Sequence, residues 1–276
     1  MKSQFFLNQI VPILLSVVIC AVLVFALWLE IHALNFFRPS DILLSVRWFD
    51  VLIGMSIYFK TSIDFAVFMG HLMSKNPGLK GRIAIELGTA TGNALGTMLI
   101  LLVWNLFREV KWLLALMILV AALVLFKLAE DSLEHAVIEE KGQYGFLARL
   151  TRTLERSLSR INKMVAPVLR YIIPNVSMKG AGNLPFWSLF VFSFTVPFIL
   201  GLDDFAGYVP LFNVVRVFGF AIGVMVAHML LNILLFISPR HTEMVVKNPV
   251  LSLMGSIAFI GLGLWGLVEV AHLIGV

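Results

Sequence analysis

The sequence predicts an all-α membrane protein with seven transmembrane helices. Of its 276 residues, 60% are hydrophobic and only 13% are charged, whereas soluble domains carry about 25% charged residues. The apolar residues gather in segments of about 20 residues or more, the length that crosses a bilayer as a helix. A short motif recurs in two of these segments and divides the last six into two groups of three. The expected fold is therefore one extra N-terminal helix followed by two inverted three-helix repeats.

The seven predicted spans can be placed to within a few residues. The first follows Lys2 and resembles a signal peptide, but it is long enough to span a bilayer and lacks a convincing cleavage site, so we expect a retained helix. The fifth contains Pro197, Gly201, Gly207 and Pro210, which a membrane helix tolerates where neighbours or a cavity satisfy the freed backbone groups. In chain order the spans are 10–34, 48–73, 83–107, 112–130, 185–212, 213–237 and 250–275.

These spans suggest four units. They are an N-terminal transmembrane helix at 1–40, repeat one at 41–135, a cytoplasmic linker at 136–183 and repeat two at 184–276.

The linker predicts a basic amphipathic helix. Its cationic residues recur at spacings of three and four, and an apolar stripe adjoins them. Such a helix lies on an anionic membrane surface. It could sense lipid composition or simply anchor the connection between the two repeats. The cationic residues are Arg149, Arg152, Arg156, Arg160 and Lys163, and the stripe is Leu147, Leu150, Leu154, Leu158 and Ile161.

Charge and cysteine usage narrow the class further. The formal net charge is +5, which in a membrane protein reflects basic cytoplasmic loops rather than nucleic-acid binding. Placing the N-terminus in the cytoplasm puts the basic linker and most loop Lys and Arg residues inside, and the C-terminus outside. The predicted location is the inner cell membrane. A single cysteine, Cys20, forms no internal disulfide, thiolate zinc site or dithiol redox pair.

The repeated motif is Asp-Phe-Ala, at 64–66 and at 204–206. Aligning Asp64 with Asp204 superimposes the two copies. A second alignment, in which the offset along the sequence is slightly smaller, places Gly88 on Gly223 and Asn93 on His228. Three spans in each unit make the units enter the membrane in opposite directions, which is a common plan of secondary transporters with a site near the midplane.

Four predicted spans contribute polar residues at similar depth. Asp64 lies in the second, Asp203 and Asp204 in the fifth, Asn93 in the third and His228 in the sixth. Carboxylate and amide oxygens suit hard divalent cations, and an imidazole shifts the preference toward transition metals. We therefore expect these residues to hold a divalent cation. Because intramembrane aspartates are costly, a functional role is the default interpretation.

Several of these residues have structural alternatives. Asp64 could pair with Lys60, which could also act as a counter-charge of an empty site. Asn93 could join packed helices, and His228 could be a ligand, a proton carrier or a packing residue. The transport path could also include Glu86, as a ligand or proton acceptor, and Asn232, one turn beyond His228 on the same face. Gly88, Gly92 and Gly96 form a row that favours close helix packing.

The motifs resemble a known family. The sequence Thr61-Ser62-Ile63-Asp64-Phe65-Ala66-Val67 is similar to the repeated motif of the bacterial manganese exporters. Gly201-Leu202-Asp203-Asp204-Phe205-Ala206 resembles motifs of the tellurium-resistance membrane proteins and the cadmium-resistance exporters. All belong to the LysE-type transporter superfamily. The resemblance implies two inverted three-helix repeats, paired metal-binding aspartates at Asp64 and Asp204, and efflux. Phe65 and Phe205 replace the usual small or amide residue.

The sequence thus predicts a transporter of a divalent metal cation that works by alternating access, could be coupled to protons and needs no cofactor. The alternatives are an exporter of amino acids or other small organic solutes, and an accessory subunit that does not transport. An enzyme is not expected, because no zinc-hydrolase or serine–histidine pattern occurs at one depth. The expected partners are the bilayer, the cation and anionic lipids at 149–163, with no nucleic acid; a homodimer stays open.

Overall fold

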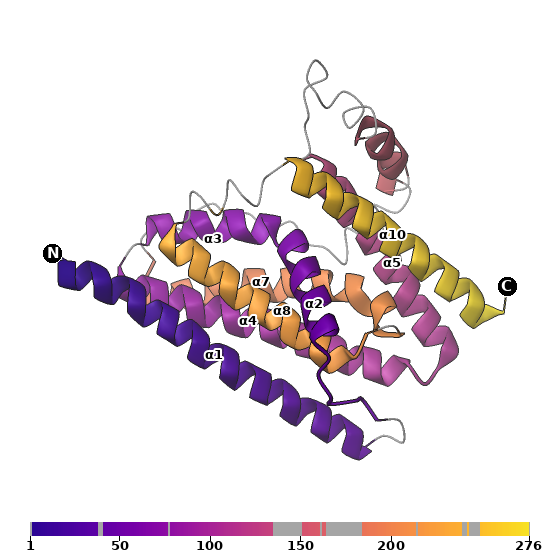
Figure 1. Ribbon diagram of the computed structural model, residues 1–276, viewed down its shortest axis with the longest axis horizontal. Coiled ribbons are helices and arrows are strands. Elements are labelled where there is room, and N and C mark those ends of the chain that lie inside the picture. The colour runs from indigo at the N-terminus through magenta and orange to yellow at the C-terminus, as the bar shows by residue number, and fades with distance from the viewer. Residues whose placement is uncertain are drawn as a thin grey trace.

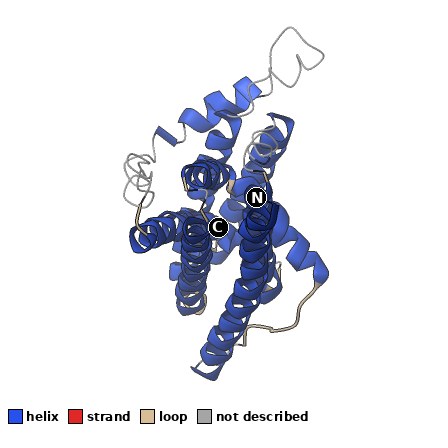
Figure 2. Cartoon of the chain, turned by 90° about the vertical axis from the view of Figure 1, so that its left-hand side faces the viewer, coloured by secondary structure: helices blue, strands red, loops and turns tan. Residues whose placement is uncertain are grey.

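A computed structural model shows that the chain is all-helical, with no strand among the described residues (Figures 1 and 2). The structure describes every residue except 1, 38–40, 77, 135–150, 161, 164–183, 214, 239–241, 243–248 and 276, and leaves out the side chains of 2–9, 60, 63, 64, 67, 68, 134, 200–208, 213 and 251. The helices are α1 (Lys2–Phe37), α2 (Trp48–Thr61), α3 (Ile63–Lys75), α4 (Leu79–Phe107), α5 (Lys111–Glu134), α7 (Phe186–Tyr208), the 3-10 helix η1 (Val209–Asn213), α8 (Val217–Ile237) and α10 (Pro249–Ile274); residues 151–160 are also helical.

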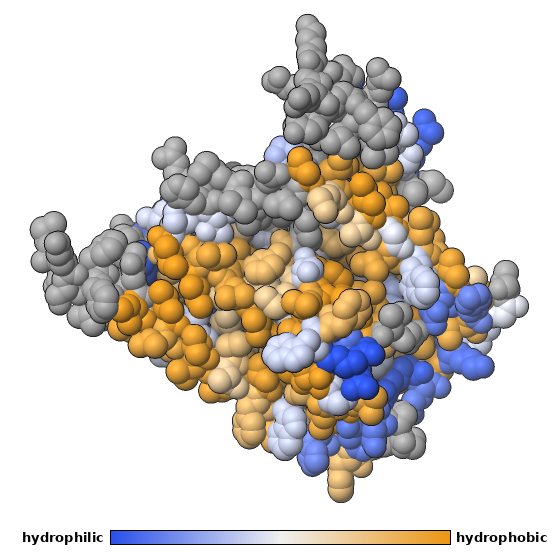
Figure 3. Space-filling view, in the orientation of Figure 1, coloured by the Kyte–Doolittle hydropathy of each residue, from blue (hydrophilic) through white to orange (hydrophobic). Residues whose placement is uncertain are grey.

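Several helices are long and apolar enough to cross a membrane. Within the described residues there are five candidate spans, namely Ile10–Phe37, Leu79–Phe107, Lys111–Leu133, Val217–Ile237 and Ser252–Ile274, and two shorter apolar helices, Trp48–Phe59 and Phe186–Ile199. Large apolar side chains such as Phe25, Leu99 and Leu264 are exposed on them. Apolar colours cover much of the face seen in Figure 3. This surface is compatible with a multi-pass membrane protein, because lipid replaces water around it.

The second predicted span differs from the structure. The prediction of one continuous helix over 48–73 is wrong, because the helix breaks at Ser62 and α2 and α3 run in different directions (Figure 1). At the end of α2, Tyr58 O accepts hydrogen bonds both from Ser62 N at 3.0 Å and from Thr61 Oγ1 at 3.1 Å. With 14 residues, α2 rises only about 21 Å at 1.5 Å per residue, less than the roughly 30 Å hydrocarbon core.

Three helix pairs build the bundle: α4 with α7, α2 with α8, and α5 with α10. The first two pairs touch backbone to backbone at glycines. A Cβ on Gly92 would lie 2.3 Å from Phe194 O, and one on Gly223 would lie 2.2 Å from Val51 O. Only glycine permits these crossings, and the row that contains Gly92 predicted the one on α4. Helix α1 packs along both α4 and α8.

The linker helix is amphipathic where it is described. Leu154 and Leu158 pack against a cluster from α5 and α10 that includes Phe126 and Leu253. Asn162 holds the same face of the linker helix against α5, because its Nδ2 donates hydrogen bonds to Glu130 Oε2 at 2.5 Å and to Phe126 O at 3.3 Å. This part of the apolar stripe is thus covered by protein.

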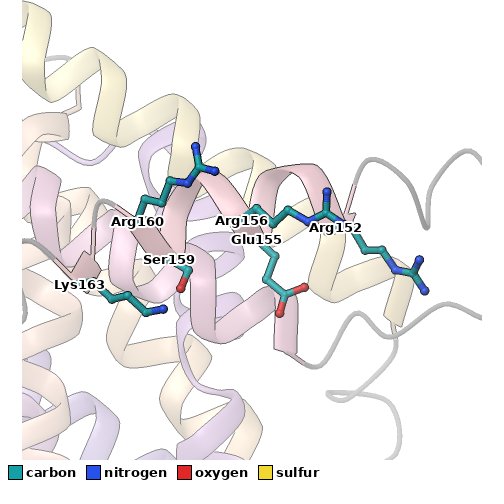
Figure 4. Close-up of a pocket in the computed structure, with 6 residues that line it drawn as sticks. All are labelled: Arg152, Glu155, Arg156, Ser159, Arg160 and Lys163. Carbon is teal, nitrogen blue, oxygen red and sulfur yellow. The ribbon is translucent and has the colours of Figure 1, made fainter.

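The other face of this helix carries Arg152, Arg156, Arg160 and Lys163, which line a surface pocket with Glu155 and Ser159 (Figure 4). Leu147, Arg149, Leu150 and Ile161 lie outside the described residues.

Candidate functional site

A hydrogen-bonded chain of buried polar side chains crosses the centre of the bundle. It begins with Tyr58 on α2 and His228 on α8, which are exposed by 2% and 0%. The Tyr58 hydroxyl lies 2.6 Å from His228 Nδ1. This contact lies between the two helices that Gly223 brings together, so the close crossing positions the pair.

Asn232 continues the chain on α8, one turn after His228. Its Nδ2 lies 3.3 Å from His228 Nε2 and donates to Thr89 Oγ1 on α4 at 3.3 Å. Thr89 is held in place because its hydroxyl donates to Ile85 O at 2.8 Å. Asn232 and Thr89 are fully buried. Through these two residues, α4 joins the pair formed by α2 and α8.

Glu86 lies at the α1 side of this chain. Its side chain is fully buried, and Ser16 on α1 and Asn232 on α8 are close enough to interact with its carboxyl group. Neither carboxyl oxygen makes a hydrogen bond of good geometry, and Asn232 Oδ1 also has no hydrogen-bond partner among the described residues. Ser16 Oγ donates instead to Pro12 O at 3.0 Å. The chain thus ends in acceptors that the described residues do not satisfy.

The start of α3 adjoins the same chain. Phe65 is 3% exposed, and its ring centroid lies 5.0 Å from that of His228. Asp64, the residue before it, is the second residue of α3, directly after the break at Ser62. The structure thus places the Phe65 ring against the imidazole, and the prediction that Asp64 and His228 lie at one depth stays a prediction.

The structure does not describe the predicted cation ligands themselves. The side chains of Lys60, Asp64, Asp203 and Asp204 lie outside the described residues. Asn93 is described and is buried on α4, with an exposed fraction of 4%. Within the described part of the chain, no group of three or more His, Cys, Asp or Glu side chains is arranged to hold a metal ion.

The structure brings together Glu86 and Asn232, which were predicted on the transport path, and His228, which was predicted as a cation ligand. Sequence reasoning missed Tyr58 and Ser16. Tyr58 stands six residues before Asp64 in an apolar segment. Its hydroxyl could have marked it as a site residue, because a buried phenol needs a hydrogen-bond partner.

The chemistry of the chain follows from its atoms. Both ring nitrogens of His228 face hydrogen-bonding groups, so neither is open to a metal in this arrangement. Hydroxyl, imidazole, amide and carboxyl groups can donate, accept or relay protons. A scan against protein-family models and searches among curated proteins and solved structures found no match to this chain.

Proposed function

We propose that this protein is a multi-pass membrane transporter that moves a divalent metal cation, in an inner membrane with its N-terminus in the cytoplasm. The observation that carries the proposal is the buried chain of Tyr58, His228, Asn232, Thr89 and Glu86. Polar groups inside a membrane bundle are expensive, and they mark ion paths and proton relays. A protein that only needed to fold could have filled these positions with apolar side chains.

The helix crossings support two inverted repeats. The alignment that places Gly88 on Gly223 relates α4 to α8, and the alignment that places Asp64 on Asp204 relates α2 to α7. A twofold-related pair of crossings should therefore join α4 to α7 and α2 to α8. These are the observed pairs, and Gly88 approaches Phe190 O on α7 as Gly223 approaches Val51 O on α2.

The proposed cation site lies where α2 and α3 meet. A broken helix frees backbone groups near the midplane, and transporters bind their substrates at such breaks. Asp64 stands at this break, and we assign Asp64, Asp204 and Asn93 to the cation, with Asp203 as a neighbouring carboxylate. His228 is assigned to the hydrogen-bond chain, because its ring nitrogens already have partners.

In this proposal the two repeats rock against each other and expose the site to one side of the membrane at a time. The resemblance of the motifs to metal exporters favours efflux as the direction. Exposed arginines on the linker helix, Arg156 and Arg160, are proposed to contact anionic lipids.

The first test is thermal stability of the detergent-purified protein with Mn²⁺, Mg²⁺, Ca²⁺, Zn²⁺, Co²⁺ or Cd²⁺. A ligand that binds only the folded state stabilises it by about 2.7 kcal/mol at 100 times its Kd. We expect the midpoint to rise with one or two ions, and to lose that rise in Asp64→Asn/Asp204→Asn. Asp41→Asn, at an exposed position, is the matched control and should keep the rise.

Transport by reconstituted protein then separates the remaining classes. Ion movement across proteoliposomes that is lost in the double variant supports the proposal. A midpoint unchanged by every ion contradicts a cation site. Stabilisation by amino acids instead would favour the organic-solute exporter, and co-purification of a partner with inert proteoliposomes would favour the accessory subunit.

A further inference from the structure

One face of α4 carries a stripe of four polar side chains, Glu86, Thr89, Asn93 and Thr97. All four are buried, with exposed fractions of 4% or less. At 3.6 residues per turn, their directions around the helix axis fall within about 80° of one another. From Glu86 to Thr97 the stripe rises about 16 Å, which is about half the thickness of the hydrocarbon core. The stripe is therefore long enough to guide a polar ligand through much of the membrane.

This stripe is separate from the glycine face of α4. A Cβ on Gly88 or Gly92 would meet backbone oxygens of α7 at 2.6 and 2.3 Å, and these glycines lie about 120° away from the stripe around the helix axis. On the stripe itself, Thr89 Oγ1 accepts a hydrogen bond from Asn232 Nδ2 on α8. Packing against α7 thus accounts for the glycines and leaves the polar stripe unexplained.

The stripe carries polar atoms that its neighbours do not satisfy. Both carboxyl oxygens of Glu86 and the hydroxyl oxygen of Thr97 are buried without a hydrogen-bond partner among the described residues. Such atoms are rare in folded proteins and cost free energy, and the core of a bilayer offers no water in compensation. A polar ligand or water that reaches this face would satisfy them.

Aromatic rings close this face of α4 at both ends. Trp104 stands about five turns after Glu86 on the same side of the helix, and its ring centroid lies 5.0 Å from that of Phe212 on η1. One turn before Glu86, the Arg82 guanidinium lies 5.9 Å from the centroid of the Phe236 ring on α8. Each contact joins the first predicted repeat to the second. A rocking of one repeat against the other would therefore act on both contacts.

We propose that the polar face of α4 from Glu86 to Thr97 lines the permeation path of this protein, and that the two aromatic contacts close the path in this structure. The inference rests on the proposed function and adds the wall along which the ligand passes. This wall offers carboxylate, hydroxyl and amide oxygens and no sulfur, so the ligand class is a hydrated hard cation. Asn232 contacts His228, and Phe65 lies beside that imidazole, so the path adjoins the start of α3.

Cysteine labelling in proteoliposomes tests this path. Thr97→Cys places a thiol on the stripe with little change in size. Leu95→Cys is the matched control, because it lies two residues earlier and about 160° away around the axis, at a leucine that is 46% exposed. Both are made together with Cys20→Ala, which removes the single native thiol. A membrane-impermeant methanethiosulfonate reacts with thiolates that water reaches, so Thr97→Cys should react at least about 10-fold faster than Leu95→Cys.

A second pair of variants keeps the test decisive if Thr97→Cys does not fold. Asn93→Cys places a thiol at another position of the stripe, and Ala94→Cys is its buried neighbour, at nearly the same depth but turned by about 100° around the axis. An intact thermal unfolding transition shows that each variant is folded before it is labelled. If the stripe positions react no faster than Leu95→Cys and Ala94→Cys, the polar face is closed packing and the proposal is overturned.

Removing one ring tests the closure of the path. Trp104→Ala should raise the labelling rate of Thr97→Cys several-fold, because the ring that contacts Phe212 is gone. Trp112→Ala makes the same change at a tryptophan of α5 that is 72% exposed, and it should leave the rate unchanged. Equal rates in the two variants would overturn the closure at this end.

The labelling result does not depend on metal transport. If a cation raises the unfolding midpoint, a saturating concentration of that cation should slow the labelling of Thr97→Cys. If no cation does so and the stripe is still labelled, the cation proposal fails while the path along α4 stands. Metal transport together with stripe cysteines as slow as Leu95→Cys gives the reverse result, in which the cation crosses the bundle elsewhere and the path along α4 is refuted.

Discussion

The crossing of α2 and α8 can be tested by giving Gly223 a side chain. In Gly223→Ala the new Cβ would lie 2.2 Å from Val51 O and 2.9 Å from its carbonyl carbon, whereas ordinary contacts begin near 3.4 Å. The two helices must therefore move apart at this point until the missing distance is made up. The obstructing atoms belong to backbone, which cannot turn aside as a flexible side chain would.

The same separation would act on the polar chain. Tyr58 and His228 join the same two helices at 2.6 Å, and a comparable displacement takes this distance beyond the roughly 3.2 Å limit of a well-formed hydrogen bond. Overpacking costs about 1–3 kcal/mol, and the lost hydrogen bond costs about 0.5–1.5 kcal/mol. Alanine returns about 1 kcal/mol of helix propensity. We expect a net loss of about 1–3 kcal/mol in the free energy of unfolding.

Thermal unfolding of the purified variant measures this loss. The broken contact is read from the nitrogen-15 NMR signals of His228 in histidine-labelled protein, assigned with His228→Gln. Gly261→Ala on α10 is the control, because nothing lies within 4 Å of its Cβ position. It should be neutral or slightly stabilising. If Gly223→Ala is as stable as Gly261→Ala and keeps the His228 signals of the wild type, the close crossing of α2 and α8 does not exist as described.

Three further substitutions test other contacts of the bundle. In Gly92→Ala the new Cβ would lie 2.3 Å from Phe194 O on α7. We expect the protein to lose about 1–3 kcal/mol in thermal unfolding, as in Gly223→Ala. An unchanged unfolding midpoint would argue against the α4–α7 crossing. Asn162→Ala removes the hydrogen bonds to Glu130 and to the Phe126 carbonyl, both on α5. It should speed protease cleavage of the linker several-fold, through a loss of about 1–3 kcal/mol. An unchanged cleavage rate would show that Asn162 does not hold the linker helix on α5. Asp50→Asn weakens the two hydrogen bonds from Arg47 at 2.7 and 2.8 Å and should lower the midpoint of thermal unfolding, because Asp50 is buried and its partner is lost. An unchanged midpoint would mean that the pair is not formed.

Much of the helical structure could be predicted because apolar length is a local property. Leu79–Phe107, Lys111–Leu133 and Val217–Ile237 overlap three of the predicted spans. The break at Ser62 could not be read in the same way. No proline or glycine stands between Gly54 and Gly70, so neither of the residues that commonly interrupt a helix marks this position. Thr61 Oγ1 donates to Tyr58 O at the break, but serine and threonine make such bonds in continuous helices as well.

The candidate site was predictable only in part, because its contacts join distant residues. His228, Asn232 and Glu86 could be predicted as site or path residues from their positions along their helices. The position of a residue in a helix fixes both its depth in the membrane and the helix face on which it lies. Height and face do not say which helices are neighbours. Tyr58 and His228 are 170 positions apart in the sequence, and no local pattern pairs them. Their contact depends on Gly223 and the crossing that it permits.

The two crossings have the same close backbone approach at glycine but different side chains beside it, and this difference bears on how each crossing could move. The two alignments of the repeats place Tyr58 on Phe198 and His228 on Asn93. The α4–α7 crossing therefore carries a phenylalanine where α2 carries the tyrosine, and Phe198 stacks on Phe194 with centroids 5.5 Å apart. A phenyl ring can neither donate nor accept a proton. The hydrogen-bonded chain of Thr89, Asn232, His228 and Tyr58 thus reaches α2, and Phe198 cannot extend a similar chain to α7. If the repeats move against each other, a shift at the α2–α8 crossing must therefore keep or break the buried Tyr58–His228 hydrogen bond, whereas a shift at the α4–α7 crossing acts on the Phe194–Phe198 stack.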